Sequence, residues 1–214
     1  MSFTAKVWKD SPDASTPLSA AGVIDLETRV TTYADTIVAA AATPNFIPSD
    51  YGYLAWAYDP VTTINSASPT AGKIYVIKCK AITALSISNI HLNVVTAGVG
   101  LTSGQNFAAL YQGAAKIGVS ADQTTAWGST GFKTIALSGG PYSVTAGMFQ
   151  VVFWANASTS TPAFTRGSAT TVTNGILSSA NARFATADTG ITTTGPSTLA
   201  SLTSLDTAYW VAVS

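Results

Sequence analysis

The segment KIYVIKCKA, Lys73–Ala81, decides the fold class, because apolar and polar side chains alternate along it. In an extended strand every second side chain points to the same face. Tyr75, Ile77 and Cys79 therefore share one face, whereas the two interior lysines lie on the other face beside further apolar side chains. This pattern predicts a β-strand.

Four more segments repeat this alternation or read as apolar strands. They are ALSISNIHLNVV (84–95), FKTIALS (132–138), MFQVVFWANA (148–157) and TAYWVAVS (207–214). Segments rich in Gly, Pro, Ser and Thr, such as SGGPYSVTAG, separate them as turns. No second helical pattern follows residue 51. The sequence therefore predicts a mainly β protein whose residues 51–214 form an antiparallel β-sandwich or barrel. Within that class we favour a sandwich with jelly-roll or Greek-key connections.

The composition points to a surface covered by small polar side chains. Charged residues make up only 9% of the 214 residues, against about 25% in ordinary globular domains. Hydrophobic residues make up 47%, yet no window approaches the roughly 18 uninterrupted apolar residues that a membrane-spanning helix needs. The first ten residues, MSFTAKVWKD, also lack the apolar core of a signal peptide. We therefore expect a soluble, non-secreted protein without a membrane partner, held in an assembly that covers several of its faces.

The charges balance overall but are unevenly distributed. The first 50 residues hold six of the ten acidic residues and three of the ten basic residues, so the remainder of the chain is slightly basic. Neither part contains a block of like charge. Because nucleic-acid affinity comes largely from neutralising phosphates, we expect no nucleic-acid partner.

The N-terminal region is predicted to contain an extended arm, residues 1–17, and a linker, residues 43–50. Two prolines in each of these segments favour extended backbone and end any helix. Phe3 and Trp8 cannot be buried by so short an arm, so we expect them to contact a partner surface. Together with Asp10, Pro17 and Leu18 they form the candidate attachment residues.

Residues 18–42 between the arm and the linker are predicted to form a helix. Ser19 is a suitable N-cap, and acidic residues follow it in the first turns, where the helix dipole favours them. The apolar residues are spaced three and four apart, as in a heptad seam, over about two heptads. They are Val23, Leu26, Val30, Tyr33 and Ile37. This spacing predicts a self-associating helix, and the alternative is a helix packed once against its own domain.

The residues that could carry out catalysis are few. Asp59, Asp122, Asp188 and Asp206 are the acidic residues of the predicted sandwich, and each lies in a segment typical of turns. The single histidine, His91, lies among asparagines in a polar row expected to face solvent or an interface. The single cysteine, Cys79, is expected to be a buried strand thiol. We therefore predict no enzyme activity, no catalytic residue, no metal site and no cofactor.

Binding is better supported than catalysis. Tryptophans and tyrosines among Ser, Thr and Asn are typical of surfaces that recognise sugars. Trp154 and Trp210 lie inside apolar strands and are expected to pack in the core. Trp127, in the loop-like stretch TTAWGSTG, is the predicted ligand-contact residue.

The N-terminal stretch FTAKVWKDSPDASTPLSAAGVIDLETRVTTYAD resembles the start of minor tail and fibre-type proteins of tailed bacteriophages. In that family an aromatic-Trp-x-Asp strand, a linker and a Thr-Pro-Leu/Ile turn lead into a helix that begins a trimeric appendage. Trp8, Asp10, the turn at residues 16–18 and the helix at residues 20–30 match this layout. Ile24-Asp25 replaces the Leu-Asn pair often found there. The resemblance covers roughly the first 36 residues.

The resemblance implies a structural protein of a phage virion, assembled in the host cytoplasm. It implies a homotrimer whose arm binds other virion proteins and whose β-sandwich head faces the host, where a surface glycan is a candidate ligand. A capsid-bound head fibre or decoration protein is the alternative, since the resemblance does not say where the arm attaches. A polysaccharide depolymerase is less favoured, because the sandwich has only four, scattered carboxylates.

Overall fold

The computed structural model describes residues 27–32 and 46–214. Residues Phe46–Ser214 form one compact unit, which we call the β body. The β body begins before the boundary predicted at residue 51, because the end of the predicted linker folds into the 3-10 helix η1 (Pro48–Tyr51). A proline at the start of η1 fits its backbone, and the Asp50 carboxylate accepts a hydrogen bond from the Ile47 N–H at 2.8 Å.

The N-terminal region is described only at residues 27–32, which are α-helical and lie inside the predicted helix. The hydroxyls of Thr31 and Thr32 donate to backbone carbonyls one turn earlier, at 2.9 and 2.8 Å. Val30 is 61% exposed in the single chain. The trimer stays a prediction, because the other seam residues lie outside the described residues, as do the candidate attachment residues. These are Val23, Leu26, Tyr33 and Ile37, and Phe3, Trp8, Asp10, Pro17 and Leu18.

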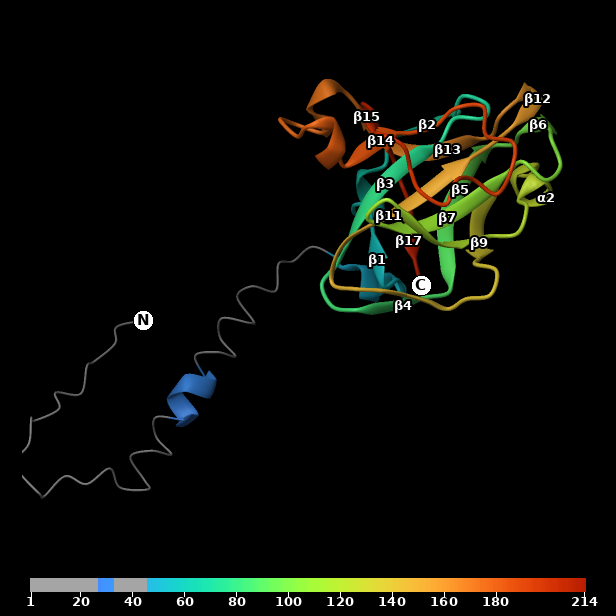
Figure 1. Ribbon diagram of the computed structural model, residues 1–214. Helices are drawn as coiled ribbons and strands as arrows, with labels where there is room; N and C mark the ends of the chain where they lie inside the picture. Colours follow the sequence, from blue (N-terminus) through green and yellow to red (C-terminus); the bar gives the residue numbers. More distant parts are fainter. Residues whose placement is uncertain (1–26, 33–45) are drawn as a thin grey trace, which may run out of the picture. The chain divides into compact units, whose positions relative to one another are not determined.

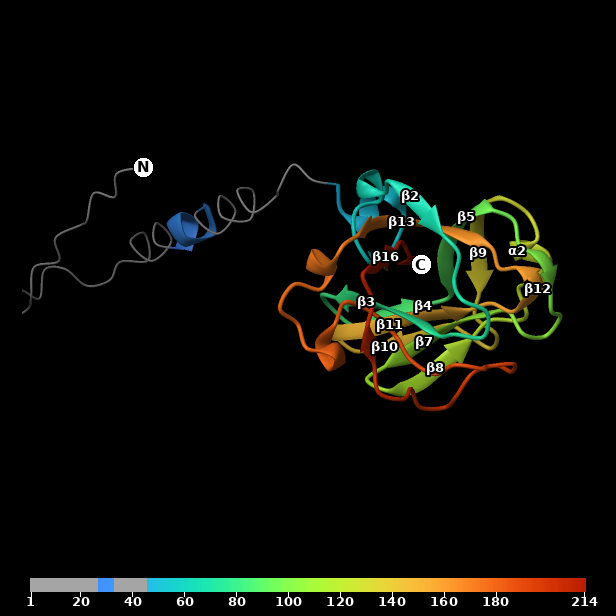
Figure 2. The same cartoon turned by 90° about the horizontal axis from the view of Figure 1, so that it is seen from above.

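Two antiparallel sheets form two layers of the β body (Figures 1 and 2). Sheet A contains β1 (Ala55–Trp56), β2 (Asn65–Ala67), β5 (Asn89–Thr96), β9 (Gly131–Ala136), β13 (Ala163–Ala169), β16 (Thr207–Tyr209) and β17 (Ala212–Val213). Sheet B contains β3 (Tyr75–Ala81), β7 (Phe107–Gln112), β8 (Ala115–Val119), β11 (Gly147–Trp154), β14 (Phe184–Thr186) and β15 (Thr203–Ser204). The predicted mainly β, antiparallel fold is therefore confirmed.

Short elements connect these sheets. Two strand pairs lie outside them: β4 (Leu85–Ile87) with β10 (Tyr142–Val144), and β6 (Val99–Leu101) with β12 (Ala157–Ser160). The other short helices of the β body are η2 (Pro60–Thr62), α2 (Thr124–Trp127), η3 (Thr171–Thr173) and η4 (Ser179–Asn181). The helix α2 was not predicted, because four residues are too few to show a helical period.

Strand β5 organises sheet A. It pairs with β9 along one edge, over Asn89–Val94, and with β17 and β13 along the other. Strand β17 lies between β1 and β5, with Ala55 opposite Val213 and Ala212 opposite His91. The first and last strands of the β body are therefore neighbours.

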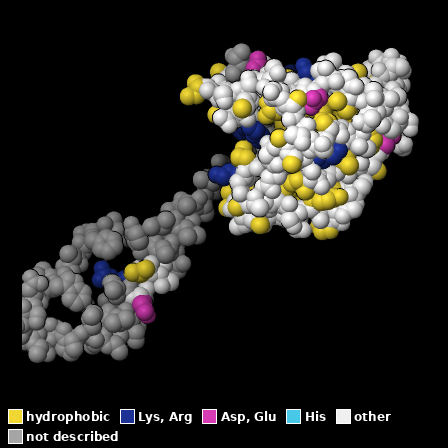
Figure 3. All heavy atoms as spheres, in the orientation of Figure 1, with side chains coloured by type: hydrophobic (Ala, Val, Ile, Leu, Met, Phe, Trp, Pro, Cys, Tyr) yellow, Lys and Arg dark blue, Asp and Glu magenta, His cyan; other side chains and the backbone are white. Residues whose placement is uncertain are grey.

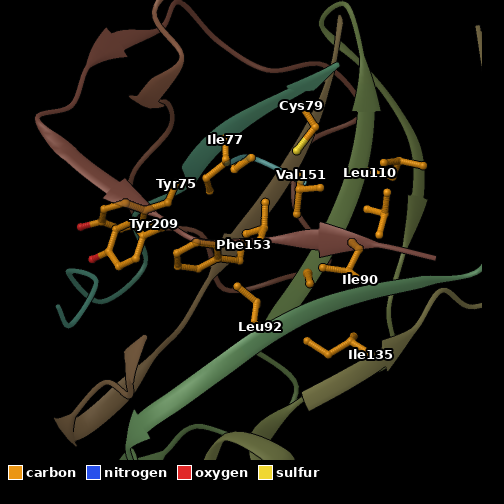
Figure 4. Close-up of a cluster of buried hydrophobic side chains, with 14 of the residues drawn as sticks. Tyr75, Ile77, Cys79, Ile90, Leu92, Leu110, Ile135, Val151, Phe153 and Tyr209 are labelled. Carbon is orange, nitrogen blue, oxygen red and sulfur yellow. The ribbon is translucent and has the colours of Figure 1, made fainter. Parts of the chain in front are cut away.

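The main core fills the space between the two sheets (Figure 4). Strand β3 contributes the predicted face, and its Tyr75 ring stacks on Phe153 of β11 at 5.5 Å between ring centroids. Phe153 in turn meets Phe164 of sheet A edge to face at 4.9 Å. Ile90, Leu92 and Val94, the apolar residues that alternate along β5, are buried in this core.

Sheet B is also covered on its outer face. Val76 of β3, with Val152 and Trp154 of β11, packs there against Ala182 and Leu199 of the following segments. The Trp154 indole N–H donates to the Thr193 carbonyl at 3.1 Å. Because both faces of these strands are buried, their sequences are nearly continuous apolar runs, as in FQVVFW.

Candidate binding site

A cleft lined by aromatic rings lies on the outer face of sheet A. It has a volume of about 260 Å³. Four aromatic residues line it: Tyr51, Tyr53, Phe132 and Trp210. Pro60, Thr63, Asn93 and Thr165 complete the lining. We call these eight residues the aromatic cleft.

Strand alternation places the cleft residues. Asn93 of β5 lies between the buried Leu92 and Val94, so its side chain is on the outer face. Phe132 of β9 is directly opposite Asn93. Thr165 of β13 follows the buried Phe164 and is likewise on the outer face. Three neighbouring strands therefore bring one aromatic ring and two hydrogen-bonding groups to the same place.

The rings of the cleft form a connected group around His91. Trp210 lies 6.0 Å from Tyr53 and 6.2 Å from Phe132 between ring centroids. His91 contacts the same two rings, at 5.1 Å from Tyr53 and stacked at 5.5 Å on Phe132. Phe132 is 50% exposed, whereas Trp210 and His91 are buried. The cleft thus has a buried aromatic base and an exposed ring at its edge.

Some polar groups of the cleft are already bonded and others are free to bind. The Trp210 N–H donates to the Tyr58 carbonyl at 3.1 Å, and the Thr63 hydroxyl donates to the Pro60 carbonyl at 2.8 Å. The Asn93 amide N–H donates to the Thr165 hydroxyl oxygen at 2.7 Å. Within the described residues no hydrogen bond reaches Asn93 Oδ1, and the Thr165 hydroxyl keeps its proton to donate. The pair can offer a ligand one acceptor and one donor.

The cleft carries no charge near neutral pH. Burial lowers the pKa of His91 below its ordinary value of 6.5, so its imidazole is neutral at pH 7. Its Nε2 lies 2.8 Å from the Ser214 hydroxyl and its Nδ1 lies 3.3 Å from the Thr134 hydroxyl. Burial also raises the pKa of the Tyr53 hydroxyl, which stays protonated. The cleft is suited to a neutral ligand with an apolar face and hydroxyl groups.

Trp127 is not part of this site, and its prediction as a ligand-contact residue is wrong. Its side chain is completely buried in the main core, where it meets Phe164 edge to face at 5.1 Å. The stretch that looked like a loop contains α2, whose last residue is Trp127, and this turn directs the indole inward. The indole N–H has no hydrogen-bond partner among the described residues.

His91 does not face solvent, which was one of the two surroundings predicted for its row; the other, an interface, stays a prediction. It is on the outer face of sheet A, as the alternation requires, but Tyr53 and Phe132 cover it. At the start of the strand the backbone N–H groups of Ser88 and Asn89 both donate to the Ser214 carbonyl, at 2.7 and 2.8 Å. Within this row His91 is therefore buried beneath the cleft, whereas Asn93 lines it.

The other candidate residues have structural surroundings. The four aspartates lie outside strands, as predicted, and three accept backbone N–H groups: Asp59 from Val61 at 2.9 Å, Asp122 from Asn106 at 3.1 Å and Asp188 from Ala200 at 3.3 Å. Cys79 is buried as predicted, and burial raises the pKa of its thiol to about 12. In the described part of the chain, no three His, Cys, Asp or Glu side chains are grouped as metal ligands.

Tyr51, Tyr53 and Phe132 were missed by the sequence analysis. Phe132 carries the clearest signal, because it occupies the polar register of a strand whose Ile135 is buried. A large aromatic ring on the solvent-facing side of a strand indicates a candidate binding surface when other aromatic rings lie near it. The two tyrosines lie in the stretch YGY, where no period indicates which way they point.

No protein-family model matches this chain, and no curated protein shows significant similarity to it. Within the described residues, no helix is long and apolar enough to cross a membrane. The case for a function therefore depends on the chemistry of the aromatic cleft and on the N-terminal resemblance.

Proposed function

We propose that the chain is a non-enzymatic virion protein of a tailed bacteriophage, whose β body is an adhesive head for a neutral glycan of the host surface. The N-terminal arm attaches the chain to other virion proteins, and residues 18–42 form a homotrimer. The head is a sandwich of jelly-roll type. The resemblance over roughly residues 1–36 supports the attachment role, and the aromatic cleft supports the adhesive role.

The observation that carries the adhesive role is the uncharged aromatic cleft. Sugar rings have an apolar face of C–H groups, which stack on aromatic side chains, and hydroxyl groups at their edges. In the cleft, Phe132 offers an exposed ring. Asn93 and Thr165 offer a hydrogen-bond acceptor and donor beside it. An apolar lining with a few placed polar groups is the usual composition of a small-ligand site.

Phe132→Ala tests this role against a matched control, Met148→Ala. Phe132 and Met148 are each 50% exposed, and each lies on a strand, but Met148 is outside the cleft. Purified full-length protein is labelled and titrated onto host cells and onto host-wall polysaccharide. We expect Phe132→Ala to weaken binding about tenfold or more and Met148→Ala to leave it unchanged. Equal binding by both variants would refute the glycan site.

A second assay tests the non-enzymatic part of the proposal. Host-wall polysaccharide is incubated with the purified protein, and reducing ends are measured over time. We expect none to be released. Release that disappears in a single Asp→Asn variant would establish a depolymerase instead; the variants are Asp59→Asn, Asp122→Asn, Asp188→Asn and Asp206→Asn.

Attachment and trimer formation are tested separately from adhesion. Deleting residues 1–17 should leave the β body folded but abolish incorporation into particles. Sedimentation of the purified protein should give the mass of three chains. Truncated protein that still enters virions would exclude the arm as anchor, and a stable folded monomer would exclude the trimer. An image of particles carrying labelled protein distinguishes the tail from the capsid.

A further inference from the structure

A second cavity of the β body is basic rather than neutral. It has a volume of about 500 Å³ and lies between the start of the β body and the end of β3. Lys80 and Arg183 line it together with Trp56 and the apolar side chains of Ile47, Leu54 and Ile82. Figure 3 shows basic and hydrophobic side chains together in a hollow beside β3 and β14. We call this site the basic cavity.

Both cations of the basic cavity are available to an anion. Lys80 and Arg183 are exposed, and neither has a carboxylate partner among the residues that the structure describes. The Arg183 guanidinium donates to the Ala57 carbonyl and lies 5.5 Å from the Phe184 ring centroid and 5.9 Å from that of Tyr58. These contacts fix its position but leave other N–H groups for a ligand. Two such cations in one cavity favour a carboxylate-bearing ligand.

The edge of strand β3 is open at the same place. Strand β14 pairs with β3 from Tyr75 to Ile77, and the Lys78 N–H donates to the Arg183 carbonyl at 2.9 Å. In antiparallel pairing, alternate residues direct their N–H and C=O groups to the same side. The backbone N–H and C=O groups of Lys80 therefore point to the same side of β3 as β14, but beyond the end of the pairing between the two strands. No described residue is hydrogen-bonded to either group.

The rim of the basic cavity is apolar. Ile82 is 80% exposed, and Ile47 and Leu54 are 53% and 43% exposed. Exposed large apolar side chains beside an open strand edge are typical of a surface that another chain covers. A free sugar acid would satisfy the two cations but would use neither the strand edge nor these side chains.

We infer that the basic cavity binds an extended acidic segment of a partner protein, which pairs with the edge of β3 at Lys80. The backbone of the segment exchanges hydrogen bonds with the Lys80 N–H and C=O, as in other cases of strand addition. Its carboxylates lie beside Lys80 and Arg183, and its alternate apolar side chains cover Ile82 and Leu54. This inference is independent of glycan binding in the aromatic cleft.

The test uses the full-length protein and a capped peptide of sequence Thr-Val-Asp-Val-Asp-Leu, with a control peptide in which Asn replaces both Asp residues. Binding is followed by amide chemical shifts at up to about 1 mM peptide. We expect the acidic peptide to shift the Lys80 amide signal and to slow its hydrogen exchange. The Asn peptide should bind roughly three- to tenfold more weakly at low salt.

Lys80→Gln should weaken acidic-peptide binding by a similar factor, whereas Lys73→Gln, near the start of the same strand but outside the cavity, should not. Arg183→Gln is a second test, with folding checked by the unchanged amide spectrum elsewhere. Absence of binding, or equal binding by the Lys80→Gln and Lys73→Gln variants, would overturn the inference. So would glucuronic acid binding as tightly as the peptide, because the ligand would then be a small anion.

Discussion

Two groups of aromatic rings lie on opposite faces of sheet A, and they differ in what surrounds them. On the inner face Phe164 meets Trp127 and Phe153, and none of these three rings is exposed. On the outer face Phe132 is half exposed, with hydrogen-bonding groups beside it. Residue type alone therefore does not distinguish a ring that stabilises the fold from one that can recognise a ligand. The surroundings do, and substitutions should separate the two roles.

The largest effect is expected on the inner face. Trp127→Ala should lower the free energy of unfolding by about 3–5 kcal/mol, because a completely buried aromatic side chain is replaced by a cavity. Chemical denaturation of the purified variant measures this loss. A variant with unchanged stability and weakened cell binding would show that Trp127 contacts the ligand, and the two faces of sheet A would then not differ in role.

A smaller effect on the same face sharpens the contrast. Trp127→Phe should cost about 1–2 kcal/mol, less than the alanine variant, since much of the ring volume is kept. The substitution also removes an indole N–H that has no partner among the described residues. The same denaturation series measures it. A cost equal to that of Trp127→Ala would mean that the N–H forms an interaction worth as much as the ring.

On the outer face we expect a substitution to weaken ligand binding more than it lowers stability. Thr165→Val keeps the shape of the side chain but removes the hydroxyl that accepts from Asn93 at 2.7 Å. We expect glycan binding to weaken about fivefold, which corresponds to roughly 1 kcal/mol. Stability should change by about 0.5 kcal/mol or less, as for most surface positions. Titration with host-wall polysaccharide and denaturation of the same sample give the two values. A large stability loss with intact binding would make Thr165 a structural residue.

The smallest effect is a dependence of stability on pH. Because the pKa of His91 is lowered on folding, the unfolded chain binds more protons in the interval between the two pKa values. Stability contributed by neutral His91 is therefore fully present at pH 7. It falls as the pH drops below the ordinary value of 6.5, and levels off below the folded pKa. His91→Gln should lose this slope in denaturation measured from pH 7.5 to 5. An unchanged slope in the variant would assign it to other groups.

The strands were predictable from sequence because burial repeats along them with a period of two. That period correctly placed Ile90, Leu92 and Val94 in the core. The run FQVVFW identified a strand with apolar side chains on both faces, but it did not identify what covers the outer face, where distant residues such as Leu199 pack. The local sequence pattern shows which residues of a strand are buried, whereas the residues that cover them are set by long-range packing.

The binding site was not predictable to the same degree. The aromatic cleft is assembled from η1, η2 and their following residues, from β5, β9 and β13, and from the residue after β16, which only the tertiary fold brings together. The burial of Trp127 was not predictable, because the four-residue helix that turns it inward leaves no periodic signal. A ring in the polar register of a strand, as at Phe132, was the one local sign of an exposed aromatic surface.

The position of β17 has a consequence for how the protein is made in the cell. Strand β1 pairs with β17, so sheet A cannot close until residues 212–213 have left the ribosome. At a synthesis rate of roughly 5–20 residues per second, the chain between these strands takes about 8–30 s to translate. During that time β1 and the part of β5 at Ile90 and His91 lack their β17 partner, and unpaired edges promote aggregation. We therefore expect messages with a stop codon shortly before residue 211 to yield insoluble chains, although they encode nearly all of the core.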